Sequence, residues 1–331
     1  MTTASPPAHA TRHEPRRRRA SGDTERGFSR VFRWITTGAG VLLLGVLAAV
    51  AAFLVARALP AFTASQAELL ADGKLPAGVT SIAQYVGPLV FGTLLAAAMA
   101  LAIATPIAMG IALFISHYAP RRIASGIGYV VDLLAAIPSV VFGLWGGRVL
   151  APLIADFWVW LVGVLNVLPF VEFRATATGR SLATASIVLA VMILPIITAV
   201  SREVFLQTPK LHEEAALALG ATRWEMIRTA VLPFGRSGVI SAAMLGLGRA
   251  LGETMAVLMI LSTGLGYSLQ IFGAGELTTI AANIASRFPE ASGLAVNVLI
   301  ATGLALFIIT LAVNMAARAI VARRKDFSGA N

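Results

Sequence analysis

Two charged side chains, Arg249 and Glu253, lie in an otherwise apolar stretch of the sequence and could bind an anion together. A guanidinium is a planar fork of donors that fits the oxygens of a phosphate or a carboxylate. A carboxylate four residues away lies on the same face of a helix, so it can neutralise the guanidinium when no anion is bound. We therefore predict that these residues, with the hydroxyl of Thr254 beside them, lie in a pathway for an anionic substrate.

Two explanations are open for a charged pair inside a membrane. A helix that begins near Val239 would place Arg249 about 15 Å along its axis, close to the middle of a bilayer. A central charge costs roughly 2.5–3.5 kcal/mol on insertion scales, so hydrophobic insertion alone does not account for it. An ion pair that only fixes helix packing is the alternative to a substrate pathway. Gly248 and Gly252 would let either a helix or a ligand approach the backbone closely, so they leave both interpretations open.

Composition places the pair in a membrane protein and excludes other kinds of site. Of the 331 residues, 57% are hydrophobic and 13% are charged, and the mean hydropathy is +0.82. A soluble domain carries about 25% charged residues. The chain has no cysteine and its four histidines are scattered, so we predict no disulfide and no metal site. No lysine stands in a Gly-x-x-x-x-Gly-Lys-Ser/Thr motif, so we expect no cofactor and no ATP hydrolysis by the chain itself.

The elements that position these residues are long apolar helices. A helix needs about 20 mainly apolar residues to cross a bilayer, and we predict an all-α polytopic membrane protein with six transmembrane helices, at 35–59, 89–116, 126–147, 184–205, 239–263 and 293–322. A seventh apolar segment at 157–171 is short, so we predict that it is re-entrant or interfacial. The remaining segments are a disordered basic tail at 1–34, an outer loop at 60–88, a loop at 206–238 and a tail at 323–331.

Basic residues predict the orientation of these helices. The formal net charge is +10, from 26 Lys and Arg against 16 Asp and Glu. With six spans, nineteen of the basic residues fall on the side of both termini and six on the other. Positive charge marks the cytoplasmic side, so we predict a multi-pass protein with both termini in the cytoplasm. The basic tail is then expected to contact anionic membrane lipid and not nucleic acid.

The predicted cytoplasmic loop has the signals of a helical hairpin. Thr208 is a predicted N-cap, and Gly220 can end the first helix in a left-handed conformation. Thr222 and Glu225 have the spacing of a capping box that opens a second helix, which Pro233 should interrupt at the membrane surface. The first helix is rich in alanine, so it is thin enough to enter a groove on another protein.

This loop resembles the EAA loop of ABC-importer permeases. The residues that match are Glu214, Ala215, Ala216, Gly220, Leu232 and Pro233, with Val231 where the family has Ile. The resemblance implies the type I ABC-importer permease fold. It also implies that the loop is a coupling helix, on which two separate ATP-binding cassette subunits dock at 209–233.

The segment 247–257 resembles one group of ABC-importer permeases in particular. It is similar to the fifth-span signature of the permeases of phosphate-specific ABC importers, and closer to their C type than to their A type; segments 105–110, 136–145 and 280–284 agree. The resemblance covers roughly residues 89–322. It implies that the chain forms half of an alternating-access pathway for inorganic phosphate in the cytoplasmic membrane of a prokaryote. It also implies that Arg249 and Glu253 are the residues of functional interest. The implied partners are a second permease in a heterodimer and an external phosphate-binding protein.

Other functions and smaller predictions stay open. An ABC permease for another oxyanion (phosphonate, sulfate or molybdate) would share the loop. An ion-coupled secondary transporter, with Glu253 as proton carrier, would leave the loop without a purpose. A membrane scaffold would leave the two charges without a purpose. Asp132 is either the partner of a cation in the bundle or a solvated residue. Four polar residues on the outer side could dock the binding protein, but we favour their anchoring the segment 157–171: Arg148, Glu172, Arg174 and Arg180.

Overall fold

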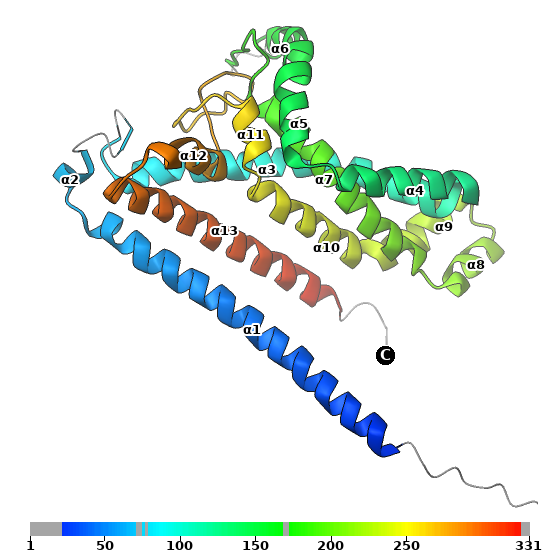
Figure 1. Ribbon diagram of the computed structural model, residues 1–331. Coiled ribbons are helices and arrows are strands. Elements are labelled where there is room, and N and C mark those ends of the chain that lie inside the picture. The colour runs from blue at the N-terminus through cyan, green and yellow to red at the C-terminus, as the bar shows by residue number, and fades with distance from the viewer. Residues whose placement is uncertain (1–21, 71–74, 77–78, 168–171, 326–331) are drawn as a thin grey trace, which may run out of the picture. The chain divides into compact units, whose positions relative to one another are not determined.

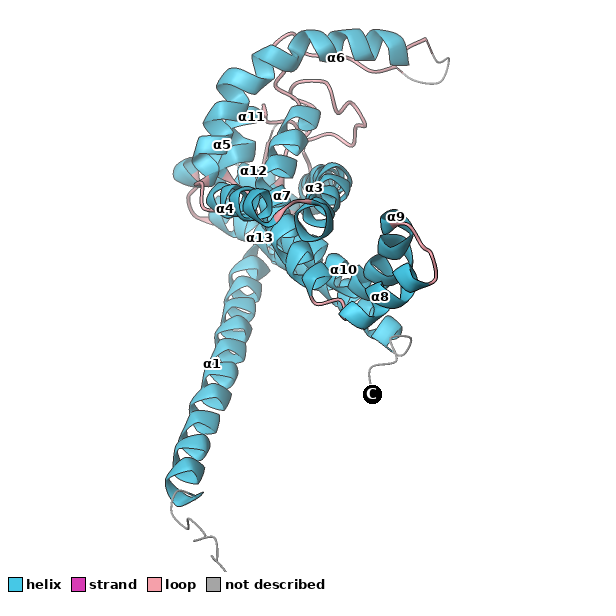
Figure 2. Ribbon diagram, turned by 90° about the vertical axis from the view of Figure 1, so that its right-hand side faces the viewer, coloured by secondary structure: helices cyan, strands magenta, loops and turns pink. Residues whose placement is uncertain are grey.

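The computed structural model describes residues 22–70, 75–76, 79–167 and 172–325, and all regular elements in these ranges are helical (Figure 2). The chain divides into two units, residues 1–52 and 53–331. The described part of the first unit belongs to a single helix, whose side chains from 29 to 50 are exposed. An apolar helix exposed on all sides is typical of a segment that contacts lipid.

The helices have the following bounds, in chain order (Figure 1). They are α1 Gly22–Thr63, α2 Gln66–Leu70, α3 Ile82–Leu113, α4 Arg121–Ala135, α5 Ser139–Trp145, α6 Ala151–Leu165, α7 Leu182–Leu206, α8 Lys210–Ala218, α9 Arg223–Met226, α10 Leu232–Leu251, α11 Met255–Ile260, α12 Ile280–Arg287 and α13 Leu294–Lys325. Three π-helical turns continue or join them, namely η2 Phe114–Tyr118, η3 Gly146–Leu150 and η4 Ile227–Val231, and η5 Phe288–Glu290 is a 3-10 turn.

Six helices in the described ranges are long and apolar enough to cross a membrane, which confirms the all-α polytopic prediction. They cover Ser29–Thr63, Ile82–Tyr118, Ser139–Leu165, Leu182–Leu206, Arg223–Leu251 and Leu294–Ala319. The number agrees with the sequence analysis, but the bounds differ from it, most of all for the third and fifth helices.

The third predicted span, 126–147, falls across two helices. The chain leaves the helical conformation between Ala135 and Ser139, because Pro138 lacks an N–H and restricts the residue before it. The long apolar helix starts at Ser139 and runs through η3 to Leu165. Residues 157–165, predicted as a separate re-entrant segment, are therefore the end of this helix, and 168–171 lie outside the described residues.

The fifth predicted span, 239–263, differs at both ends. One helix runs from Arg223 through η4 and Pro233 to Leu251, so Pro233 does not interrupt it. The π-helical turn explains this, because Leu232 N–H bonds to the carbonyl of Ile227 and the hydrogen-bond pattern has shifted just before the proline. The helix ends at Leu251, twelve residues earlier than predicted.

The predicted bounds of the N-terminal segments also differ from those in the structure. Helix α1 begins at Gly22, so residues 22–34 are helical and not disordered, while residues 1–21 lie outside the described part. The predicted outer loop at 60–88 contains α2 and the start of α3, which Ser81 caps by accepting from the N–H of Gln84.

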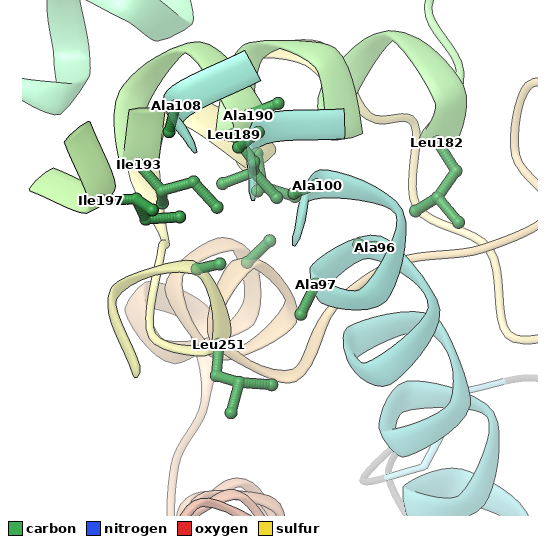
Figure 3. Close-up of a cluster of buried hydrophobic side chains, with 14 of the residues drawn as sticks. Ala96, Ala97, Ala100, Ala108, Leu182, Leu189, Ala190, Ile193, Ile197 and Leu251 are labelled. Atoms are coloured by element: carbon green, nitrogen blue, oxygen red, sulfur yellow. The ribbon is translucent and has the colours of Figure 1, made fainter. Parts of the chain in front are cut away.

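The core of the second unit lies between α3, α7 and α10. A stripe of alanines on α3, including Ala96, Ala100 and Ala108, packs against Leu189 and Ile193 of α7 (Figure 3). Small residues let helix backbones approach closely, which is how helices associate where no water drives them together. Ala250 and Leu251 complete this cluster from the end of α10, so the core directly supports the segment that carries the two charges.

Candidate functional site

The candidate site is a break in the chain between α10 and α11. Helix α10 ends at Leu251, residues 252–254 are not helical, and α11 starts at Met255. Arg249 lies in the last turn of α10, and Glu253 lies in the break itself. The two residues therefore do not share a helix face, which the prediction of one continuous span required.

Glu253 is buried and caps α11. Its side chain is 9% exposed, and its Oε1 accepts a hydrogen bond from the N–H of Ala256 at 3.1 Å. The first N–H groups of a helix lack partners within the helix and carry partial positive charge, so a carboxylate is favourable there. Among the described residues, the ion pairs within 4.0 Å are His117–Glu213 and Arg202–Glu203. The predicted pair of Glu253 with Arg249 is not formed in this structure.

Arg249 lacks partners in the described part of the chain. Its side chain is half-buried, and its Nε is inaccessible to solvent and has no hydrogen-bond acceptor. A buried donor without a partner costs about 1–3 kcal/mol. The Nε donor at the end of α10 is thus unpaired, and an acceptor oxygen of a bound anion or of a carboxylate from another subunit would stabilise it. The Thr254 hydroxyl donates to the carbonyl of Gly252 at 3.2 Å and does not accept a hydrogen bond from Arg249 in this structure.

The side of α10 beside Arg249 is open. A Cβ added at Gly248 would meet nothing within 4 Å, and one at Gly252 would meet only the carbonyl of Gly248 at 3.7 Å. No helix in the described residues packs there, so these two glycines leave room for something outside the chain. The glycine that permits helix packing is Gly246, whose added Cβ would lie 2.9 Å from Cδ1 of Ile197 on α7. Sequence reasoning missed it because spacing does not show which face of α10 is covered.

Helix α11 is held in place by α5 and its continuation η3, which pack against it. A Cβ at Gly143 would lie 2.7 Å from Cα of Ala256, and one at Gly147 would lie 2.7 Å from the carbonyl oxygen of Met259. The guanidinium of Arg180 donates to that same carbonyl at 3.1 Å. These backbone contacts fix the short helix that Glu253 caps, and no sequence motif marks them.

The other polar residues of the sequence analysis lie apart from the break. Arg180 anchors α11, and not the segment 157–171. The backbone of Glu172 and of Arg174 bonds to the side-chain amide of Gln270, which ties the segment before α7 to the loop after α11. Asp132 and Arg148 are exposed on α4 and η3, and neither is in an ion pair among the described residues.

The predicted helical hairpin is present in the structure. Gly220 takes the left-handed conformation with φ +86°, and both hydrogen bonds of the capping box between Thr222 and Glu225 are formed. Thr208, by contrast, does not cap α8: the helix has no side-chain cap, and the Thr208 hydroxyl is buried without a partner. Pro209, with its fixed φ, stands at the N-cap instead.

The residues of the EAA resemblance are displayed on the hairpin surface. Glu214, Ala215, Gly220 and Pro233 are exposed, while Ala216 and Leu232 are half-buried. A shallow groove of about 360 Å³ lies beside Pro233, lined by Met109, Leu232, Pro233, Arg236, Val239 and Ile240. Helix α8 has no buried residue, so the hairpin presents an exposed helix to another protein.

Comparisons with known proteins agree with this arrangement. Residues 102–326 match the family described as "Binding-protein-dependent transport system inner membrane component". The Mycobacterium tuberculosis "Phosphate transport system permease protein PstC 2" is 46% identical over 310 residues, which cover 88% of this chain and 91% of that protein. The Mycobacterium leprae "Phosphate transport system permease protein PstC" is 47% identical over 275 residues, which cover 82% and 86%.

A solved structure shares the fold. The crystal structure of a bacterial ABC transporter involved in the import of the acidic polysaccharide alginate superposes with a TM-score of 0.55 at 16% identity, over 90% of this chain and 99% of that one. At this identity the likeness concerns the fold alone, and it supports an ABC-permease architecture for the helices described above. With a family match over residues 102–326 and relatives above 45% identity along most of the chain, the protein belongs to the family of binding-protein-dependent transport system inner membrane components.

Proposed function

We propose that this chain forms half of the translocation pathway of an ATP-driven importer for inorganic phosphate. The relatives above are named as phosphate transport permeases, and they match the segment that contains Arg249 and Glu253. The observation that carries the proposal is the unpartnered Arg249 guanidinium beside an open face of α10. A bidentate donor fork suits a phosphate oxyanion, and the absence of a fixed counter-ion leaves the fork free to bind one.

In this proposal Glu253 does not act as the neutralising partner of Arg249 that the sequence predicted. Its carboxylate occupies the N-terminus of α11 and so holds the break between the two helices in shape. Broken helices at substrate sites are a recurring arrangement in transporters, because the break brings backbone and side-chain groups to the substrate. Glu253 and Thr254 then shape the site, and Arg249 supplies the charge.

The proposed assembly follows the family to which the chain belongs. A second permease would complete the pathway as a heterodimer, two ATP-binding cassette subunits would dock on the hairpin at 209–233, and an external phosphate-binding protein would deliver the substrate. The distribution of basic residues favours both termini in the cytoplasm, and the membrane would be the cytoplasmic membrane of a prokaryote. ATP binding would move α8 and open the pathway outward, and hydrolysis would reset it inward. The chain itself carries out no ATP hydrolysis.

Uptake of labelled phosphate into vesicles that hold the co-purified complex tests the proposal. We expect uptake that requires ATP and the external binding protein, and that excess sulfate does not inhibit. Uptake that persists without ATP would contradict an ABC importer and favour a secondary transporter. Stronger inhibition by sulfate than by unlabelled phosphate would assign the pathway to a different oxyanion.

A further inference from the structure

The two halves of the hairpin are held to the rest of the chain very differently. In the second half, Met226, Ile227 and Val231 are buried against the end of α3 and against Phe205 of α7. In the first half, α8 has no buried residue, and only Ala216 joins this cluster as a half-buried member. Apolar packing therefore fixes α9 and η4 but leaves the position of α8 to few contacts.

One polar contact links α8 to the end of α3. His117 lies in η2, the π-helical turn that continues α3, and its Nε2 is 3.5 Å from Oε1 of Glu213 on α8. The His117 side chain is 8% exposed and that of Glu213 is 24% exposed, so water screens this pair less than it screens a surface pair. Within the described part of the chain, no other side-chain hydrogen bond or ion pair joins α8 to another element.

The imidazole of His117 is held in one orientation. The hydroxyl of Ser116 lies 2.7 Å from its Nδ1 and 3.3 Å from the carbonyl oxygen of Leu113. If the hydroxyl donates to Nδ1, the neutral ring carries its proton on Nε2 and donates toward Glu213. If the hydroxyl donates to Leu113, Nδ1 carries a proton, and the contact with Glu213 is attractive in the doubly protonated ring. The contact with Glu213 is therefore favourable whenever Nε2 carries a proton, which is the case in the neutral ring protonated on Nε2 and in the doubly protonated ring.

We propose that His117 and Glu213 are a positioning pair that ties the coupling helix α8 to α3, so that a displacement of α8 by a docked subunit moves α3 as well. This inference rests on the proposed function, in which α8 is the helix that an ATP-binding subunit moves. Helix α3 packs along α7 and α10 in the main core cluster. A rigid packed helix transmits a displacement through its contacts, and the same cluster contains Ala250, next to Arg249.

The test uses the complete reconstituted transporter and measures phosphate imported per ATP hydrolysed. We expect Glu213→Gln and His117→Gln each to lower this ratio about two- to fivefold, the range for a partly exposed ion pair, with ATP hydrolysis retained. The double variant should be no worse than the poorer single variant, because both substitutions remove the same contact. Glu203→Gln is the matched control, since its carboxylate pairs with Arg202 of the same helix, at 2.6 Å from Nη2, and ties no elements together.

A covalent link gives a second readout. The chain has no cysteine, so the double variant His117→Cys, Glu213→Cys can be joined by a short bismaleimide at these positions alone within this chain. If α8 and α3 move together, the link should restore the phosphate-to-ATP ratio that the unlinked variant has lost. If α8 moves independently of α3, the link should stop uptake, and the proposal is then wrong.

Other outcomes separate this proposal from the proposed function. Single variants that match Glu203→Gln, or a double variant that shows the product of two independent losses, would overturn the positioning role. Failure of Glu213→Gln to co-purify with the other subunits would also overturn it, because the residue would then be a docking contact. A wild-type complex that imports no phosphate with ATP would instead refute the proposed function.

Discussion

A methyl group added at Gly143 should loosen the packing of α5 against α11, the short helix that follows Arg249 in the chain. The new Cβ would lie 2.7 Å from Cα of Ala256 and 3.0 Å from Sδ of Met259. An ordinary carbon–carbon contact is about 3.5–4.0 Å, so α5 and α11 would have to separate by close to 1 Å. Overpacking costs about 1–3 kcal/mol, and alanine regains about 1 kcal/mol over glycine in a helix. We expect a net loss of up to about 2 kcal/mol.

Gly248→Ala is the matched control for this substitution. It brings the same gain in helix propensity, but its Cβ meets nothing within 4 Å, so the purified chain should become slightly more stable. Thermal unfolding in detergent can be followed by the fluorescence of the five tryptophans. A change of 1 kcal/mol corresponds to about 2–4 °C in the midpoint for a domain of this size. If Gly143→Ala is as stable as Gly248→Ala, then α5 and α11 are not packed as closely as the distances at Gly143 indicate.

Three further predictions follow from single contacts. Glu253→Ala should lose the cap of α11 and about 0.5–2 kcal/mol of unfolding free energy, whereas Glu253→Gln should lose less because its amide oxygen still accepts; equal losses would argue against a cap. Trp158→Phe should lower the unfolding free energy by about 0.5–1.5 kcal/mol, since Nε1 donates to the buried hydroxyl of Thr184 at 2.8 Å; an unchanged unfolding midpoint would contradict this. Gly220→Ala should strain the hairpin by about 1–2 kcal/mol at φ +86° and speed tryptic cleavage after Arg223; an unchanged cleavage rate would contradict this.

The hairpin shows what sequence reasoning predicts well. Gly220, Thr222 and Glu225 act through bonds to residues at most a few positions away, so their spacing carries the whole signal. The attachment of the hairpin was not predictable in this way. Ile227 is fully buried and His117 meets Glu213 only because α3, α7 and the hairpin converge, and these contacts join residues far apart in the chain.

The break between α10 and α11 was missed for a related reason. Hydropathy treats 239–263 as one apolar run, and it gives no weight to the helical cost of Gly252, about 1 kcal/mol, at the point where the chain leaves the helix. The structure ends α10 at Leu251 and lets Glu253 satisfy the start of α11. The third span was misplaced because residues on both sides of Pro138 are apolar enough to cross a membrane, and only the local effect of the proline decides where the long helix begins.

The central claim is that the unpartnered guanidinium of Arg249 binds the phosphate in transit. The most direct measurement is the rate of ATP-driven uptake of labelled phosphate by the reconstituted complex carrying Arg249→Gln, compared with Arg318→Gln, which removes an exposed arginine near the end of α13. Losing a charge-assisted contact of about 1.5–3 kcal/mol predicts a fall of about ten- to a hundredfold for Arg249→Gln. The Arg318→Gln complex should keep the wild-type rate. Wild-type uptake by Arg249→Gln would contradict the claim.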